Sequence, residues 1–351
     1  DMSSLAECSN LGHQHPRVVA AIRAQAEQLC FVTNAWGARP RAELAARLLE
    51  LSGFEGGRVF FTLGGADANE HAVKIVRQAL GKPKGVVVAR DRSYHGSTHL
   101  AMALSGDTRT RAMVDPDAMG VTHVEPPYAY RCPFGSRNAA ECGDLAAAAI
   151  GQRIDLFGVD RVAAVVVEPN AGSNGIVAPD SYWPAVRRIT RQRGIPLIAD
   201  EVMSGFGRCG EWFAWQRYGD AGQPDVMTLA KGLTGAMMPL GAVVISCEVA
   251  ARLANQVLVT GLTYCGHPLS CAAGAAAIDR ESAHRFSPVP QNGHPVLRGE
   301  VLGRQAFRNR SIQRRYASPG MVMAATPAIT RTRPSGRCPP APASSWSTTA
   351  T

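Results

Sequence analysis

Three short, mostly apolar runs near the middle of the chain predict the centre of its fold. They span residues 163–167, 196–199 and 225–230, and a charged residue follows each of them. Runs that do not alternate with polar residues are typical of strands that are buried on both faces of a parallel sheet. A helical segment at 181–193 separates the first two runs. We therefore expect an α/β fold with a mostly parallel central sheet flanked by helices.

The same kinds of pattern extend this arrangement toward both ends of the chain. Apolar runs predict further strands at 59–63, 85–89 and 241–246. Apolar residues at helical spacing predict helices at 18–29, at 42–51, and from a glycine turn to about residue 80. Residues 107–160 are rich in proline, glycine and charge, so we expect loops and short helices there.

Two of the central strands are followed by side chains of opposite charge, Asp200 and Lys231. Because active sites in parallel α/β sheets form at the carboxyl ends of the strands, we expect both side chains in one site. Pyridoxal phosphate needs such a pair, since a lysine holds its aldehyde as a Schiff base and an acid keeps its ring nitrogen protonated. Taken singly, Asp200 is explained more simply as a turn cap and Lys231 as a solvated lysine.

The sequence around both residues resembles the signature of the class III aminotransferases, which are fold type I pyridoxal-phosphate enzymes. The similar segments are DEVMSGFGRCG at 200–210, LAKGLT at 229–234 and PLGA at 239–242. The resemblance implies a fold type I large domain. It also implies that Lys231 is the Schiff-base lysine, that Asp200 is the partner of the pyridinium nitrogen, and that Val202 packs under the ring.

A glycine turn after the strand at 59–63 is the expected phosphate site. Backbone N–H groups and the positive end of the helix dipole at such a turn can bind an anion. On its own this pattern is weak, because many such turns are purely structural. The family usually has hydroxyl residues here, whereas Gly64, Gly65 and Ala66 of this chain keep only the backbone donors.

The resemblance also assigns roles around the ring. In the segment SYHG at 93–96, Tyr94 is expected to cover the pyridine ring, with His95 beside it. The alternative for Tyr94 is packing in the core with its hydroxyl bonded. Glu168, which follows a central strand, is expected to support the cofactor and Asp200.

Two further residues are expected at the edges of the site. The segment GLTYCGHP at 261–268 is similar to a family turn whose threonine reaches the cofactor phosphate of the other subunit. Thr263 therefore implies a homodimer with a two-fold axis. Trp36 lies in a segment expected along the mouth of the site, where it would line the substrate pocket or simply pack.

Composition excludes several other classes of protein. The chain has 351 residues, of which 46% are apolar, enough for one large domain and a smaller lobe. No run reaches the roughly 18 apolar residues of a membrane span, and no signal peptide is visible, so we expect a cytoplasmic protein without membrane contact. The nine cysteines lack C-x-x-C spacing, so neither a metal site nor a disulfide scaffold is expected.

Charge and proline are concentrated at the C-terminal end. Residues 280–351 contain eleven arginines against two glutamates, which accounts for the whole net charge of +9 and argues against a nucleic-acid partner. They also contain nine of the 23 prolines and show no periodicity. We expect an irregular tail, either disordered or the product of a shifted reading frame, in place of the family's C-terminal lobe.

The expected organisation is therefore a partial N-terminal segment at 1–50, a cofactor-binding domain at 51–279 and the tail at 280–351. Residue 1 is Asp, so we expect the chain to begin inside a longer reading frame.

The expected function is ping-pong transamination from an ω-amino acid or amine to a keto acid such as pyruvate or 2-oxoglutarate. The alternatives are an aminomutase or decarboxylase of the same fold, or a non-catalytic remnant of such an enzyme. A dehydrogenase is disfavoured because no G-x-G-x-x-G lies between a first strand and helix.

Overall fold

A seven-stranded sheet forms the centre of the computed structural model, which describes residues 4–279. Its order is β1-β9-β8-β7-β4-β2-β3. The strands are β1 (Arg58–Thr62), β2 (Val86–Arg90), β3 (Val121–Val124), β4 (Val162–Val167), β7 (Leu197–Asp200), β8 (Val226–Leu229) and β9 (Gly241–Ile245). β9 is antiparallel to both of its neighbours and the other neighbouring pairs are parallel. The mostly parallel sheet expected from the sequence is confirmed.

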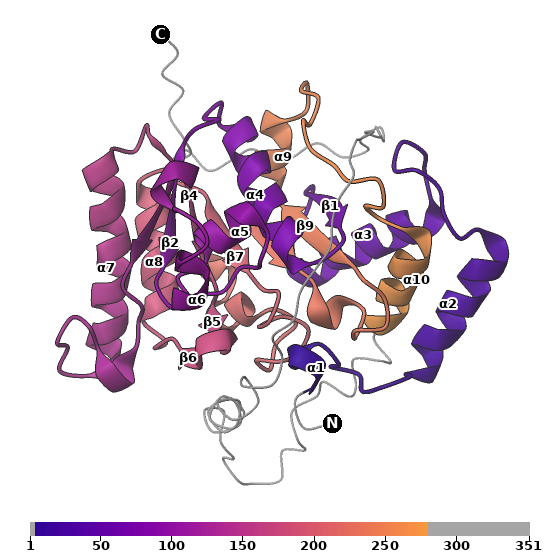
Figure 1. Cartoon of the computed structure of the whole chain (residues 1–351), viewed down its shortest axis with the longest axis horizontal. Helices are drawn as coiled ribbons and strands as arrows, with labels where there is room; N and C mark the ends of the chain where they lie inside the picture. Colours follow the sequence, from indigo (N-terminus) through magenta and orange to yellow (C-terminus); the bar gives the residue numbers. More distant parts are fainter. Residues whose placement is uncertain (1–3, 280–351) are drawn as a thin grey trace, which may run out of the picture.

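Helices cover both faces of this sheet (Figure 1). Consecutive residues of β4 point to opposite faces, so Val165 and Val167 join one buried apolar cluster while Ala164 and Val166 join the other. The first cluster includes side chains of α3 (Arg39–Ser52), α7 (Ala139–Phe157), α8 (Tyr182–Gln192) and α10 (Pro268–Ala277). The second includes side chains of α4 (Gly65–Ala79), α5 (His99–Leu104) and α9 (Cys247–Arg252). A strand between two helical layers has to be apolar at every position, which explains the unbroken runs.

The N-terminal helix α2 (Pro16–Gln28) lies against α10 at one side of the molecule (Figure 1). Both α2 and α3 have a proline in their first turn, where a missing backbone N–H costs no helical hydrogen bond. The shorter elements are α1 (Ser4–Glu7), α6 (Thr108–Arg111), and the two-stranded ribbon of β5 (Asn170–Ala171) and β6 (Ile176–Val177).

The expectation of loops and short helices at 107–160 is confirmed for parts of this segment, such as α6, but is wrong for 121–124 and 139–157. This segment contributes β3 to the sheet and the 19-residue helix α7. The Asn138 side chain caps α7 by accepting a hydrogen bond from the backbone of Glu141. The buried face of α7 contains many small residues, including Ala146, Ala147 and Gly151, and only Ile150 and Ile154 are large, so its apolar stripe is weak in the sequence.

Two further expectations concern the C-terminal tail and the membrane. The irregular tail at 280–351 and the loss of the C-terminal lobe lie outside the described residues and stay predictions. Between residues 4 and 279, no helix combines the length and apolar character that crossing a membrane requires.

Candidate active site

The carboxyl ends of four adjacent strands open onto one cavity of about 450 Å³. Asp200 is the last residue of β7, Glu168 follows β4, the 94–97 loop follows β2, and Lys231 begins the short turn after β8. All of these line the cavity, together with residues of the turn before α4. The sheet therefore brings together side chains that are far apart in the sequence.

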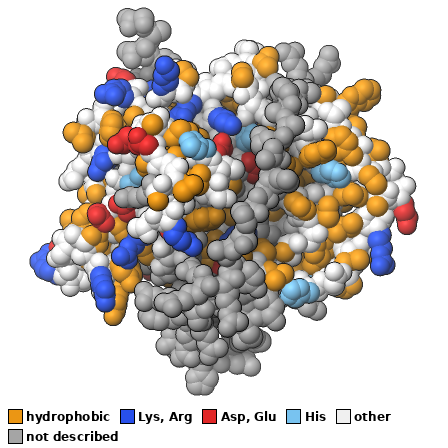
Figure 2. All heavy atoms as spheres, in the orientation of Figure 1, with side chains coloured by type: hydrophobic (Ala, Val, Ile, Leu, Met, Phe, Trp, Pro, Cys, Tyr) orange, Lys and Arg blue, Asp and Glu red, His pale blue; other side chains and the backbone are white. Residues whose placement is uncertain are grey.

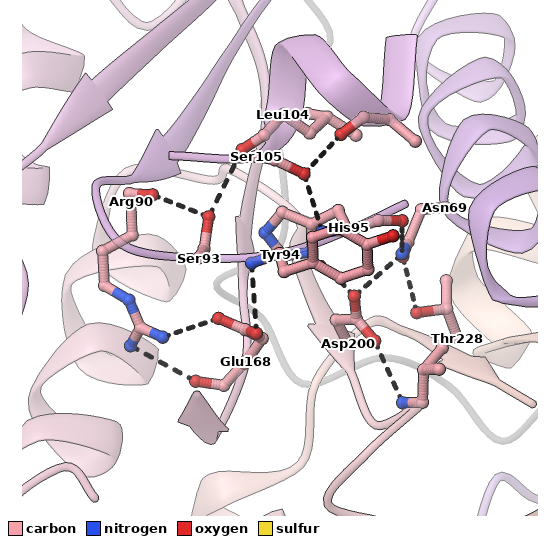
Figure 3. A network of polar contacts seen from close by, with 12 residues as sticks. Asn69, Arg90, Ser93, Tyr94, His95, Leu104, Ser105, Glu168, Asp200 and Thr228 are labelled. Carbon is pink, nitrogen blue, oxygen red and sulfur yellow. Dashed lines mark hydrogen bonds and ion pairs between the residues drawn. The ribbon is translucent and has the colours of Figure 1, made fainter. Parts of the chain in front are cut away.

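Asp200 is almost fully buried and is surrounded by hydrogen-bond donors. Its Oδ2 accepts a hydrogen bond of 2.8 Å from Asn69 Nδ2 and lies 2.7 Å from His95 Nδ1. Its Oδ1 accepts a bond of 2.9 Å from the backbone N–H of Val202. Figure 3 shows Asn69, His95 and Asp200 converging from different segments. A buried carboxylate with these partners is fixed in orientation.

Asn69 connects Asp200 to the rest of the site, a role that the sequence analysis missed. Its Nδ2 also donates to the backbone oxygen of His95, and its Oδ1 accepts a bond of 2.7 Å from the hydroxyl of Thr228 on β8. The signal in the sequence is a polar residue within the mostly apolar buried face of α4, which also contains His71. A buried amide in such a position needs partners for both of its ends.

Glu168 fixes the loop that carries Tyr94. Its Oε2 accepts a hydrogen bond of 2.8 Å from Arg90 Nη2, and both side chains are buried. Its Oε1 accepts a weaker bond of 3.4 Å from the backbone N–H of Tyr94 (Figure 3). Burial raises the pKa of Glu168, and the charge of Arg90 opposes that rise.

The glycine turn is closely packed against Val202, in the loop that follows β7. The Asp67 carboxylate accepts hydrogen bonds from the backbone of Leu63 and Gly64, which caps α4. Gly65 and Ala66 line the cavity at the start of α4, where backbone N–H groups have no partner within the helix. A Cβ atom on Gly65 would lie 2.9 Å from Val202 Cγ1.

Lys231 extends into the same cavity from a backbone with a φ of +39°. Its Nζ donates a hydrogen bond of 3.3 Å to Glu7 Oε2, and about a quarter of each side chain is exposed. Glu7 belongs to α1, a single turn with left-handed φ angles, and the sequence analysis gave it no role.

These residues fit pyridoxal phosphate. A buried carboxylate suits a cationic ring nitrogen, an amine suits an aldehyde, and a helix start suits a phosphate. The Nε2 atom of His95 is buried and has no hydrogen-bond partner in the described part of the chain. Tyr94 and Val202 also line the cavity, and Tyr94 is 38% exposed.

Two expected residues lie elsewhere in the described chain. Trp36 is largely exposed and does not line this cavity in a single chain. Thr263 is also exposed and outside the cavity.

Comparison with known families agrees with this geometry. Residues 1–287 match the sequence model described as aminotransferase class-III. The chain belongs to this family. The match ends slightly beyond residue 279, where the sequence analysis placed the end of the cofactor-binding domain.

Several relatives of this class III chain have known names. The putrescine–pyruvate aminotransferase of Pseudomonas aeruginosa is 38% identical over 76% of this chain and 59% of the relative. Gamma aminobutyrate transaminase 3 of Solanum lycopersicum is 35% identical over 84% of this chain and 61% of the relative. The chain thus spans about three fifths of the length of these relatives.

Solved structures give the same result. The taurine:2-oxoglutarate aminotransferase of Bifidobacterium kashiwanohense, in complex with PLP and glutamate, is 40% identical and has a TM-score of 0.73. The match covers 79% of this chain and 62% of that one. An (S)-enantioselective omega-transaminase of Thermomicrobium roseum is 37% identical, with a TM-score of 0.76 over 81% of this chain and 65% of that one.

Glu201, the neighbour of Asp200, points away from the cavity and is completely buried. It accepts a hydrogen bond of 3.0 Å from the backbone N–H of Trp215 and bonds the Ser204 hydroxyl, which holds the loop after β7. Burial raises the pKa of Glu201 to about 7. The sequence analysis assigned it no role.

Replacing Gly65 with Ala should weaken binding of pyridoxal phosphate by about tenfold or more, because the added methyl group displaces Val202 or the turn. Gly37→Ala is the matched control, since its Cβ would meet no atom within 4 Å and Gly37 does not line the cavity. Equilibrium titration with the cofactor measures both variants. Equal affinities in the two would contradict the phosphate assignment.

Replacing Glu201 with Gln should flatten the pH dependence of stability. The carboxyl has a raised pKa in the folded state, so its contribution is present below about pH 4.5 and is lost as the pH rises through 7. The difference amounts to about 3 kcal/mol in the free energy of unfolding. Urea unfolding at several pH values measures it, with Glu43→Gln on the exposed face of α3 as the control. A slope unchanged by Glu201→Gln would refute this account.

Proposed function

We propose that the chain carries out pyridoxal-phosphate-dependent transamination by a ping-pong mechanism. An amino group moves from an ω-amino acid or amine to a keto acid such as pyruvate or 2-oxoglutarate. The observation that carries the proposal is that Lys231 and the donor-bound carboxylate of Asp200 line one cavity beside the Gly65 turn. Membership of the class III family supports it.

Each side chain has a distinct part in this proposal. Pyridoxal phosphate, when bound, supplies an aldehyde and a ring that accepts electrons. Asp200 holds a proton on the ring nitrogen, because hydrogen bonds from Asn69 and Val202 keep its carboxylate in place as an acceptor. The amine of Lys231 anchors the aldehyde and then carries a proton as base and acid.

The relatives support an amine or ω-amino acid as donor. Their names specify putrescine, gamma aminobutyrate and taurine, three compounds with an amino group at the end of a chain. Because this chain spans about three fifths of their length, its activity and its choice of donor are proposals.

Borohydride reduction of the protein with pyridoxal phosphate should fix the cofactor covalently to Lys231, and Lys231→Ala should remove that adduct.

Asp200→Asn should retain much of the cofactor binding but lower the rate of the amine half-reaction by about 100-fold or more, since the anionic partner is lost. Peptide mass spectrometry and stopped-flow absorbance measure the two effects. An adduct on another lysine, or an unchanged half-reaction in Asp200→Asn, would refute the assignment.

We also propose that two copies of the chain form a dimer in which Thr263 of one copy reaches the phosphate site of the other. Thr263 lies among exposed apolar side chains, including Val257, Val259 and Tyr264. Tyr264 meets Phe31 at a ring distance of 5.5 Å, which joins this segment to the one that contains Trp36. Apolar patches of this kind commonly mark protein interfaces. Figure 2 shows further hydrophobic side chains gathered over the part of the molecule that holds α2 and α10.

Val259→Asp should weaken self-association by about tenfold or more, because it places a charge in the proposed interface. Leu156→Asp on α7, an equally exposed apolar residue outside the patch, is the control and should leave association unchanged. Sedimentation equilibrium measures both. A wild-type chain that stays monomeric, or equal effects of the two substitutions, would refute the interface.

A further inference from the structure

Two free cysteine side chains meet outside the cavity that holds Lys231. Cys132 follows a short turn at Ala129–Arg131, and Cys142 lies in the first turn of α7. The thiol of Cys142 donates a hydrogen bond to the sulfur of Cys132. Neither cysteine lines the cavity, and α7 lies at one side of the molecule (Figure 1). The two thiols therefore form a separate cluster of reactive groups.

Hydrogen bonds hold the loop between the two cysteines on the start of α7. The backbone N–H of Gly135 donates to the backbone oxygen of Cys132 at 3.3 Å, which closes a turn. Arg137 donates to the carboxylate of Glu141 from its backbone at 2.6 Å and from its guanidinium at 3.0 Å. Asn138 caps the same helix. Because the loop is fastened to the helix in this way, the contact between the two sulfurs is part of the fold.

The surroundings of the two sulfurs differ. Cys132 is half-buried, whereas Cys142 is fully buried. Partial burial raises the pKa of Cys132, but hydrogen bonds from the Cys142 thiol, from Ser136 and from the backbone of Phe134 outweigh this effect and lower the pKa to about 7. Burial and the contact with Cys132 raise the pKa of Cys142 to about 12. At neutral pH about half of Cys132 is therefore thiolate, the reactive form, while Cys142 keeps its proton.

The arrangement favours chemistry between two sulfurs over metal binding. Between residues 4 and 279, no group of three or more histidine, cysteine, aspartate and glutamate side chains is placed to hold a metal ion. A half-exposed thiolate beside a buried thiol suits reversible oxidation instead, because the second thiol traps the first oxidation product as a disulfide.

We propose that Cys132 and Cys142 are an oxidation site, which a peroxide closes to a reversible disulfide. The Cys132 thiolate attacks one oxygen of hydrogen peroxide, so that an S–O bond forms, the O–O bond breaks, and the leaving hydroxide takes a proton to become water. The sulfur of Cys142 then attacks that of Cys132. The S–S bond forms, the S–O bond breaks, and the hydroxyl group leaves with the Cys142 proton as a second water. The two sulfurs together lose two electrons, which the peroxide gains.

The first step also prepares the second. When Cys132 is a sulfenic acid, it no longer carries the negative charge that helps to keep the proton on Cys142. Cys142 is then a better nucleophile, and a dithiol such as dithiothreitol restores both thiols by exchange. Neither step uses the cavity of Lys231, so this inference goes beyond the proposed function and does not depend on it.

Peptide mass spectrometry after treatment of the full chain with hydrogen peroxide at pH 7 gives the first test. Blocking with iodoacetamide and digestion without reductant should yield linked peptides that contain Cys132 and Cys142, and dithiothreitol should separate them. In Cys142→Ala, a sulfenic acid should remain on Cys132, where dimedone traps it. Cys30→Ser, which removes an exposed cysteine, is the control and should leave the yield of linked peptides unchanged. Absence of the linked peptides from the wild-type chain, or Cys142 joined to another cysteine, would overturn the proposal.

The pH dependence of Cys132 reactivity gives the second test, and it needs no variant that has to fold. In the reduced wild-type chain, the rate at which iodoacetamide alkylates Cys132 should rise with a midpoint near pH 7, because only the thiolate reacts. Ser136→Ala, which removes one hydrogen-bond donor to Cys132, should raise that midpoint. A wild-type midpoint at or above about 8.5, the value of an ordinary cysteine, would overturn the proposal.

Discussion

A buried carboxylate is the constraint on which the site depends. An unpaired carboxylate in the interior costs several kcal/mol, so Asp200 is tolerable only with its donors in place. Those donors come from different segments: the amide of Asn69 from α4, the imidazole of His95 from the loop after β2, and the backbone of Val202. α4, β7 and the loop after β2 therefore have to be positioned precisely relative to one another. The hydroxyl of Thr228 on β8 extends the same requirement to the next strand.

Asp200 and Glu201 are adjacent acids that point to opposite sides of the chain, so their surroundings differ. Asp200 faces the cavity and its hydrogen-bond donors, whereas Glu201 faces the loop that folds back after β7. Burial raises the pKa of Glu201 to about 7, although the hydrogen bonds that it accepts oppose this rise. The aromatic side chains of Phe206 and Phe213 pack edge to face in that loop and join the apolar cluster on one face of the sheet.

The ring site and the mouth of the cavity are built from different parts of the chain. Strand ends and the start of α4 form the part of the cavity that we propose for the cofactor. Asp200, Val202 and Lys231 there belong to segments that resemble the class III signature, whereas the glycine turn departs from it. Cys8 of the N-terminal segment also lines the cavity. Hydrogen bonds of Arg208 and Asn10 attach this segment to the loop after β7.

The sequence by itself determined six of the seven strands of the central sheet, the positions of Asp200 and Lys231 at strand ends, and the glycine turn before α4, whereas β3 was missed. These features are local, since an unbroken apolar run or a pair of glycines before a helix can be recognised without knowing what lies nearby. α7 was missed because small side chains form much of its buried face. The hydrogen bonds of Asn69 and the contact between Glu7 and Lys231 were also missed. Only the tertiary structure decided them, because the order of strands in the sheet determines which distant polar groups meet, and no local pattern records that order.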